Sequence, residues 1–492
     1  MTGDRRWLAL VVLCLSLLAI VIDNTIVNVA LPTLVRDLGA DVSRLQWVVD
    51  AYTLVFAGLL LLAGALGDRY GRRRTLLAGL AVFGAASAGA AYAGGVDALI
   101  GARAIMGAGA AFIMPATLSL LISVFTDLRE RTMAVGIWAA TAGLGVALGP
   151  VVGGVLLDRY WWGSIFIVNV PLCALAIALG PRLVPESRDP VARRVDRTGA
   201  ILSGTGLVAL VWAVIEAPSE GWTSPPVLAA GGAGVALLGS FVLQQRRAAE
   251  PLLDVRLFRN PRFSAASATV MVLFFALFGF LFLATQYLQF VLGVSPSAAG
   301  VRVLPYAAAM IVSASVSAAL VERHGTRRIA TLGMLLFAAG LAVAATVAVD
   351  TGYGRLAIAF ALMGTGMGLA GAPATESIMS ALPPARANIG SAVNDTTREL
   401  GGALGVAVVG SIASSLYLSG LPAGAPAAAR ESLGGAALAG GAVADAAREA
   451  FVHAMATASI VVALVAAAGA LIAWIHLPAE HANASRAVRA LG

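Results

Sequence analysis

The sequence predicts an all-α integral membrane protein whose fourteen transmembrane helices form two related six-helix halves with two helices inserted between them. Three observations predict this architecture: the chain carries little charge, its apolar residues gather in long segments, and motifs of its first part recur near its end. Of its 492 residues, 59% are hydrophobic and only 12% are charged, whereas about 25% of a typical soluble domain is charged. The low charge extends along the whole chain, which excludes a soluble domain with a single membrane anchor.

A transmembrane helix needs about 20 predominantly apolar residues, and fourteen segments of the chain meet this requirement. We expect these helices at residues 8–31, 45–66, 75–93, 97–121, 133–156, 164–180, 199–217, 226–244, 263–290, 298–320, 327–348, 355–380, 389–416 and 450–475. The first segment follows Arg5 and Arg6, as the apolar part of a signal peptide would. It continues to Leu31 without a convincing small-residue cleavage site, so we interpret it as a spanning helix.

The arginines predict the orientation in the membrane. All 33 basic residues are arginines, and most of them lie in loops that face inward if the amino terminus is inside. Loops on the inner side of a membrane are enriched in basic residues. We therefore expect a multi-pass protein of the cell membrane with both termini in the cytoplasm.

The same composition excludes several functions. Without lysine, the chain has no phosphate-binding loop of the ATP-hydrolysing type. The two cysteines, Cys14 and Cys173, lie singly in apolar segments and suggest neither a metal site nor a disulfide. The basic residues form no face or motif that would bind nucleic acid. We therefore expect a protein that is not an enzyme and needs no cofactor or metal.

The loops divide the chain. A proline-rich linker near 181–198 follows the sixth segment. We expect an amino-terminal six-helix half at 1–181, linkers and the two inserted helices at 182–260, and a carboxy-terminal half at 261–492. The outer loop near 418–449 is rich in alanine and glycine, which leaves either a short helix around 440–449 or disorder.

An internal repeat relates the two halves. The loop Asp68-Arg-Tyr-Gly-Arg-Arg-Arg74 has a looser copy, Glu322-Arg-His-Gly-Thr-Arg-Arg328, and Ala104-Ile-Met-Gly-Ala-Gly109 resembles Ala361-Leu-Met-Gly-Thr-Gly366. Such repeats are typical of secondary transporters, whose sites lie at the interface of the repeats near mid-membrane. A channel formed by simple helix packing is less well supported.

The repeat also shows where the halves differ. Arg103 aligns with Phe360, so only the first half carries this arginine. Asp395 and Glu399 align with apolar or neutral residues of the first half. Departures from a structural repeat are where we expect a specific task to have been added.

Two charges lie at similar depths in the first half. Asp23 lies about 12 Å and Arg103 about 9 Å from the outer ends of their helices, so they are placed to pair. Asn24 and Asn28 extend the polar face around Asp23. Because charges inside a membrane are costly, they are functional by default, and we favour a role in transport. The alternative is a buried ion pair that only joins the two helices.

The helix at 389–416 carries the clearest polar stripe. Its members are Ser391, Asn394, Asp395, Arg398, Glu399, Gly402 and Gly405. Arg398 can neutralise only one of the two acids, and Glu376 on the preceding helix is a second candidate partner. Burial disfavours the charged form of a carboxylate, so Asp395 or Glu399 is suited to bind a proton or a cation. The alternative is a structural salt-bridge network.

Two further helices carry candidate site residues. In the helix at 263–290, we expect Phe274, Phe278, Gln286 and Tyr287 to line an apolar pocket with a polar handle, which suits a flat cation. Aromatic residues that face lipid are the alternative. The helix at 133–156 carries closely spaced small residues and a proline, which favour close packing and a bend. They are Gly145, Gly149, Pro150, Gly153 and Gly154.

These motifs resemble those of the major facilitator superfamily, in particular its fourteen-helix drug:H⁺ antiporter branch, over nearly the whole chain. The loop at 68–74 resembles the motif between helices 2 and 3 of that family. The helix 4 motif appears as Leu99-Ile-Gly-Ala-Arg103-Ala-Ile-Met-Gly107, and the antiporter motif of helix 5 as Gly145-Val-Ala-Leu-Gly149-Pro150-Val-Val-Gly153-Gly154. Asp23-Asn-Thr-Ile-Val-Asn-Val-Ala-Leu-Pro32 resembles the helix 1 motif of the branch.

The resemblance implies roles for these positions. Arg103 would support proton coupling, Asp23 would bind a proton or a cationic substrate, and Gly149 with Pro150 would shape the interface between the halves. A conformational latch near the inner face would comprise Asp68, Arg69, Gly71 and Arg72.

We therefore expect a proton-driven exporter of amphipathic, often cationic drugs or antibiotics that works by alternating access as a monomer. Its partners would be a small-molecule drug, protons and the lipid bilayer, without nucleic acid. The alternatives are an exporter dedicated to one endogenous antibiotic or metabolite, a nutrient symporter and, more distantly, a membrane receptor that moves nothing.

Overall fold

The computed structural model describes residues 3–188, 196–382 and 387–478, and these residues form helices and connecting turns without a strand. Fourteen helices in this part of the chain are long and apolar enough to cross a membrane, as predicted. Residues 189–195 of the expected linker, and the ends of the expected halves at 1–2 and 479–492, lie outside the described residues.

The helices of the first half and the inserted pair follow the predicted order. In the first half they are α1 (Gly3–Leu38), α2 (Val42–Tyr70), α3 (Arg72–Ala91), α4 (Val96–Val124), α5 (Leu128–Arg159), α6 (Ser164–Ile167) and α7 (Asn169–Leu183). The inserted helices are α8 (Arg197–Glu220) and α9 (Pro225–Arg247), followed by the short 3₁₀ helix η1 (Val255–Arg259).

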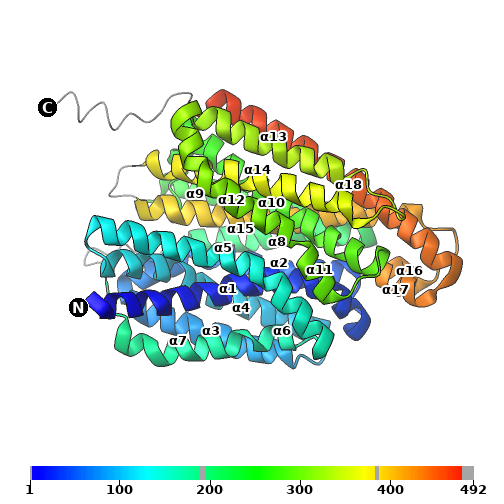
Figure 1. Cartoon of the computed structure of the whole chain (residues 1–492), viewed down its shortest axis with the longest axis horizontal. Coiled ribbons are helices and arrows are strands. Elements are labelled where there is room, and N and C mark those ends of the chain that lie inside the picture. Colours follow the sequence, from blue (N-terminus) through cyan, green and yellow to red (C-terminus); the bar gives the residue numbers. More distant parts are fainter. Residues whose placement is uncertain (1–2, 189–195, 383–386, 479–492) are drawn as a thin grey trace.

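The second half repeats this order and adds two short helices. It comprises α10 (Pro261–Gln286), the π-helix η2 (Tyr287–Val291), α11 (Pro296–Arg302), α12 (Leu304–His324), α13 (Thr326–Ala344), α14 (Tyr353–Ser380), α15 (Ala387–Gly420) and α18 (Gly441–His476). Between α15 and α18 lie α16 (Ala427–Glu431) and α17 (Leu433–Ala439). Helix α1 begins and α18 ends at the same end of the bundle (Figure 1), here named the terminal end; the opposite end, where α2 begins, is the far end.

Equivalent helices pack together in the two halves. In the first half α1 packs on α5, and α4 lies between α2 and α3. In the second half α10 packs on α15, and α14 lies between α12 and α13. A Cβ atom at Gly107 on α4 would overlap the carbonyl oxygen of Tyr52 on α2, and one at Gly364 on α14 would overlap that of Tyr306 on α12. The same close backbone approach therefore builds both halves, as the sequence repeat predicted.

Two expected single helices are interrupted. The segment expected at 164–180 consists of α6 and α7, and the segment expected at 298–320 consists of α11 and α12. Pro305 lies in the first turn of α12. Because proline lacks the N–H that would continue the helix from α11, the chain makes a turn there instead, with Tyr306 donating to the carbonyl of Val303.

The region expected as a loop at 418–449 is largely helical. Besides α16 and α17, it holds the first turns of α18, which begins at Gly441 rather than at the expected residue 450. The Tyr417 hydroxyl donates to the carbonyl of Ala429 at 2.7 Å. A Cβ atom at Gly434 would lie 2.5 Å from Val35 of α1, so α17 packs directly on the far end of the bundle.

The inserted helix α8 lies against both halves. It packs on α2 and on α15, while α9 packs on α8. The Glu216 carboxylate of α8 accepts hydrogen bonds from Ser43 at 2.7 Å and Trp47 at 3.0 Å. On the same helix, the carbonyl of Val214 accepts from Ser411 of α15 at 2.7 Å. Helix α8 therefore joins the two halves at their far ends.

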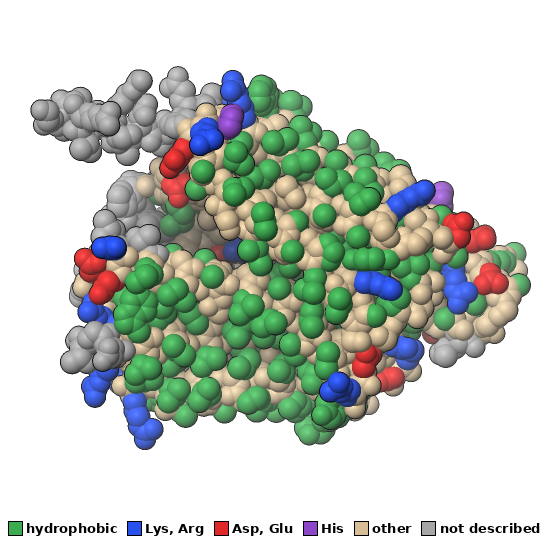
Figure 2. Space-filling view, viewed as in Figure 1, with side chains coloured by type: hydrophobic (Ala, Val, Ile, Leu, Met, Phe, Trp, Pro, Cys, Tyr) green, Lys and Arg blue, Asp and Glu red, His purple; other side chains and the backbone are tan. Residues whose placement is uncertain are grey.

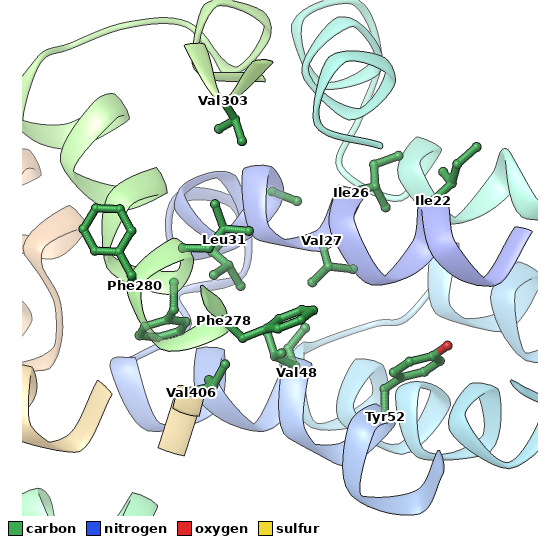
Figure 3. Packing of buried hydrophobic residues seen from close by; sticks show 14 of the residues in the cluster. Ile22, Ile26, Val27, Leu31, Val48, Tyr52, Phe278, Phe280, Val303 and Val406 are labelled. Carbon is green, nitrogen blue, oxygen red and sulfur yellow. The ribbon is translucent and has the colours of Figure 1, made fainter. Parts of the chain in front are cut away.

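Contacts between the halves close the far end. Gln46 of α2 donates to the carbonyls of Val406 and Ala407 on α15 at 3.0 Å, and Gln289 of η2 donates to that of Val29 on α1 at 2.8 Å. An apolar cluster fills the same interface, with residues of both halves facing one another (Figure 3). Its labelled members are Ile22, Ile26, Val27, Leu31, Val48, Tyr52, Phe278, Phe280, Val303 and Val406.

The terminal end is open by comparison. Figure 2 shows the surface hollowed between the halves toward the end that carries the start of α1 and the end of α18. Elsewhere, the sides of the bundle in this view are covered by apolar side chains, as expected for surfaces that contact lipid. The protein is therefore closed at its far end and open toward its terminal end.

Candidate functional site

A buried ion pair forms the centre of the first half. Nη1 of Arg103 on α4 lies 2.5 Å from Oδ2 of Asp23 on α1, and both side chains are buried. The other carboxylate oxygen of Asp23 accepts from Asn169 of α7 at 2.9 Å. The guanidinium also donates to the Val48 carbonyl at 2.9 Å and lies over the Tyr52 ring, 4.3 Å from its centroid. Both charges are therefore paired and hydrogen-bonded, as a stable buried ion pair requires.

The asparagines predicted beside Asp23 have separate surroundings. Asn28 is buried, and its side-chain amide donates to the carbonyl of Asn24 at 3.2 Å. Its Oδ1 atom has no hydrogen-bond partner among the described residues. Asn24 is partly exposed. Asn28 is thus the member of this face with an unused polar atom.

Asp50 is an acidic residue that the sequence reasoning missed. It lies within α2, is completely buried, and accepts one long hydrogen bond from Thr53 at 3.4 Å. Its Oδ2 atom has no partner in the described part of the chain. Residues four apart share a helix face, so Asp50 lies one turn from Gln46 on the face that meets α15. The sequence signal that could have identified Asp50 as a candidate site residue is its position inside the apolar segment expected to span the membrane at 45–66.

A second charged cluster lies on α15. Nη1 of Arg398 is 4.0 Å from Oδ1 of Asp395. Asp395 also accepts from Asn394 at 3.3 Å. Glu399 makes no ion pair or hydrogen bond with any residue that the structure describes. Glu376, the second predicted partner, is exposed on α14, and the structure does not bring it to Arg398.

Tyr52 lies between the two charged clusters. It is within electrostatic range of Asp23 and Arg103 in its own half and of Glu399 across the interface. Its hydroxyl is buried and has no hydrogen-bond partner among the described side chains and backbone. The charged residues of the two halves therefore face a common region of the interface.

The structure separates the four residues predicted to line one aromatic pocket. Phe274 and Phe278 stack with their centroids 6.2 Å apart, beside Arg398. Gln286 bonds to the carbonyl of Phe282 in its own helix, and the Tyr287 hydroxyl donates to that of Ala348 at 3.0 Å. Gln286 lies about 18 Å along the helix from Phe274, in the closed far end.

The predicted latch lies at the terminal end. Nε of Arg72 donates to Asp68 at 2.8 Å, and the Arg72 amide donates to the Ser187 carbonyl at 2.9 Å. Gly71 has φ 113°, and a Cβ atom there would lie 2.7 Å from Oε1 of Glu186. Arg69 stacks on Tyr70 instead of joining these bonds. These contacts join the loop between α2 and α3 to Glu186 and Ser187, which follow the end of α7.

The glycine motif of α5 contacts two different helices. Cβ atoms at Gly145, Gly149 and Gly153 would collide with Val21, Thr25 and Ile26 of α1. Gly154 instead meets Pro296 and Ser297 of α11, and the carbonyl of Pro150 lies where a Cβ of Gly300 would stand. One end of the motif therefore packs the first half together, and the other end forms the contact with the second half.

Comparison with known proteins identifies a family that matches the chain and several similar proteins whose function is described. The sequence pattern of the Major Facilitator Superfamily matches residues 13–406. The chain is 37% identical over 488 residues to "Multidrug efflux pump LfrA" of Mycolicibacterium smegmatis, which covers 96% of this chain and 97% of that protein. It is 36% identical to "Methyl viologen resistance protein SmvA" of Salmonella typhimurium, over 92% of this chain and 95% of that one. It is 34% identical to "Tetracenomycin C resistance and export protein" of Streptomyces glaucescens, over 84% and 76%.

Solved structures share the fold at low identity. A bacterial homologue of the human lysosomal transporter Spinster, inward-facing and unoccupied, superposes with a TM-score of 0.70 at 16% identity, over 98% of this chain and 100% of that chain. The peptide transporter POT in complex with sulfate superposes with a TM-score of 0.66 at 14% identity, over 95% of both chains.

Proposed function

The chain belongs to the major facilitator superfamily, and from this premise we propose that it exports amphipathic, often cationic drugs or antibiotics in exchange for protons. The observation that carries the proposal is the set of acids within the spanning helices of two halves that are closed at one end. Relatives that match most of the chain are described as efflux and resistance proteins. One of them is named for resistance to methyl viologen, which is a flat cation. We place the terminal end in the cytoplasm of a cell-membrane protein, because it carries the arginine-rich loops.

The substrate path follows from the shape of the interface. With the terminal end in the cytoplasm, a drug enters the hollow between the halves from inside. Breaking the bonds of Gln46 and Gln289 and separating α5 from α11 would then open the far end to the outside. We take the halves at 1–181 and 261–492 as the bodies that move, acting as a monomer, while α8 stays attached to both at the far end.

The acids divide into two kinds by their partners. Both oxygens of Asp23 accept hydrogen bonds, one from Arg103 and the other from Asn169, so we assign this ion pair to coupling between helices α1 and α4. Asp50 and Glu399 have free oxygen atoms, and Asp395 has only long contacts. Because burial disfavours an unpaired carboxylate, these three acids are the groups that we propose take up the proton, with Glu376 at the mouth of the path.

The energetics of one exchanged proton are adequate. One charge moved across a potential of about 100 mV gives about 2.3 kcal/mol, and a pH difference of about 1 unit adds about 1.4 kcal/mol. At about 1.4 kcal/mol for each factor of ten, these sources sustain a drug gradient of roughly several hundredfold.

A transport assay tests the proposal. Purified protein is reconstituted in liposomes, an inward or outward pH gradient is imposed, and the movement of ethidium and of protons is recorded together. Ethidium flux that reverses with the gradient and is matched by proton flux supports antiport. If a panel of cationic and neutral drugs produced neither drug flux nor proton flux, the proposal would be wrong.

One observation favours a narrower function, the export of a single antibiotic. A matched relative is described as a resistance and export protein for tetracenomycin C, and another as a methylenomycin A resistance protein. Transport of one compound among many structurally distinct drugs in the same assay would favour this alternative over broad export.

A further inference from the structure

Arg398 of α15 covers an aromatic face of α10. Its guanidinium carbon lies 4.6 Å from the ring centroid of Phe274, within the distance of about 6 Å at which a cation is attracted to a ring face. Phe274 in turn stacks on Phe278 at 22° between planes. Helix α10 is held close to α15, because Cβ atoms at Gly401 and Gly405 would collide with backbone carbonyls of α10. The two rings and the arginine are therefore held as one unit.

The other bonds of Arg398 are weak. Its nearest carboxylate oxygen, on Asp395, is 4.0 Å away, beyond hydrogen-bond distance. The guanidinium makes no hydrogen bond with the residues that the structure describes, and 40% of the side chain is exposed. The ring face is therefore its main contact, and solvent and ligands can reach it.

Arg103 provides an internal contrast. It also lies over a ring, that of Tyr52, at 4.3 Å. It is buried, however, and bonded to Asp23 and to the Val48 carbonyl. A ligand cannot displace Arg103 without breaking a buried ion pair, whereas Arg398 can move to Asp395 or Glu399 by rotating its side chain.

We propose that Arg398 is a resident cation on the face of Phe274, which a cationic aromatic substrate displaces when it binds. This inference rests on the proposed export of cationic drugs and names the binding surface and the competitor. The displaced guanidinium then pairs with Asp395 or Glu399. With both acids ionised the cluster carries one net negative charge, so it accepts either one monovalent cation or one proton, and the two exclude each other.

Binding measurements on purified protein in lipid nanodiscs test this directly. The probes are ethidium, a flat cation, and Nile red, a neutral flat dye. Arg398→Gln removes the competitor, so ethidium should bind with a roughly two- to fivefold lower Kd, the range expected for one exposed cation–ring contact. The affinity for Nile red should stay within about twofold, since a neutral ring does not compete through charge.

A second background separates competition for the ring from simple removal of a positive charge. In Phe274→Leu protein, Arg398→Gln should lower the Kd of ethidium clearly less than in the native background, because the loss of a positive charge remains but there is no Phe274 ring face left to compete for. Arg398→Gln in the native background and in the Phe274→Leu background form a double-mutant cycle. Retained Nile red binding shows that each variant is folded.

Any one of three results overturns the inference. The first is that Arg398→Gln tightens ethidium binding equally in both backgrounds, and the second is that it weakens ethidium binding. The third is that neither the native protein nor the Arg398→Gln variant binds ethidium. Failure of the proposed function looks different: the competition would be present in nanodiscs, but no pH gradient would drive drug or proton movement in liposomes.

Discussion

Arg103 and Asp23 form a buried ion pair between α4 and α1, with Nη1 and Oδ2 2.5 Å apart and Asn169 bonded to the other carboxylate oxygen. Arg103 is the residue that the second half replaces by Phe360. The pair therefore places charges in the first half where its repeat has the apolar ring of Phe360. Because the charges neutralise each other, we expect that breaking the pair changes both the stability of this half and its response to protons.

We predict that removing either charge alone is much more harmful than removing both. Asp23→Asn or Arg103→Gln leaves one uncompensated buried charge, which costs about 3–5 kcal/mol, whereas the double variant leaves none. Thermal unfolding in detergent should show a large loss of melting temperature in each single variant and partial recovery in the double variant. Equal and additive losses would contradict the pairing.

The coupling role of Asp23 has a separate test. We expect Asp23→Asn to lose pH-driven efflux at normal expression, because the carboxylate that holds Arg103 is gone. Asp97→Asn is the matched control, since this acid is mostly exposed at the start of α4. Intact pH-driven efflux by Asp23→Asn would show that Asp23 has no part in coupling.

Asp50 should be required for proton exchange but not for folding. Asp50→Asn keeps the shape of the side chain and removes a buried acid whose Oδ2 has no described partner, so we expect a melting temperature unchanged or raised. Drug-driven proton flux in liposomes should fall at least about tenfold, as for loss of a group that transfers protons. Proton flux at the native rate would exclude Asp50 from the proton path.

The two glutamines of the far end should control the balance between closed and open states. Each hydrogen bond contributes about 1 kcal/mol, so Gln46→Leu or Gln289→Leu should raise the population open at the far end by about fivefold. The measurement is labelling of Val303→Cys, near the far end, by an impermeant maleimide in protein without Cys14 and Cys173.

The control for this experiment is Gln244→Leu, which breaks bonds to Asp196 away from the interface. It should leave the labelling rate unchanged. If Gln46→Leu and Gln289→Leu also left it unchanged, these bonds would not hold the far end closed.

Gly71 should tolerate no side chain. Its φ of 113° is unfavourable for other residues, and a Cβ atom would meet Glu186, so Gly71→Ala should cost about 1–3 kcal/mol and slow transport. Gly94→Ala, where no atom lies within 4 Å of the new Cβ, is the matched control. If the Gly71→Ala variant transported drug at the native rate, this loop would have no part in the conformational change.

The fold was predictable from the sequence because membrane spans and repeats leave strong signals. Long apolar segments predicted all fourteen helices, and the offset copies predicted the equivalent packing of the halves. The break at Pro305 and the helices at 427–439 were not predicted. A proline in an apolar run permits either a bend or a break, and the helices over the far end are stabilised by packing on Val35 and Phe290.

The candidate site was only partly predictable. The similar depths of Asp23 and Arg103 in their expected helices indicated their pairing, although α1 continues to Leu38, beyond its expected end at residue 31. The contact of Arg398 with Phe274 was not visible, because it depends on how closely α10 packs on α15. Likewise, helical spacing grouped Tyr287 with Phe274, but contacts at the far end hold the two residues in different environments.

The central claim is that drug and protons move in opposite directions through this protein. The most direct measurement is simultaneous recording of ethidium and internal pH in liposomes that contain the purified protein, with Asp50→Asn as the comparison. We predict that a drug gradient alone drives protons against it, and that a reversed pH gradient reverses drug movement. Ethidium movement that is unaffected by the pH gradient and unaccompanied by proton flux would contradict the account.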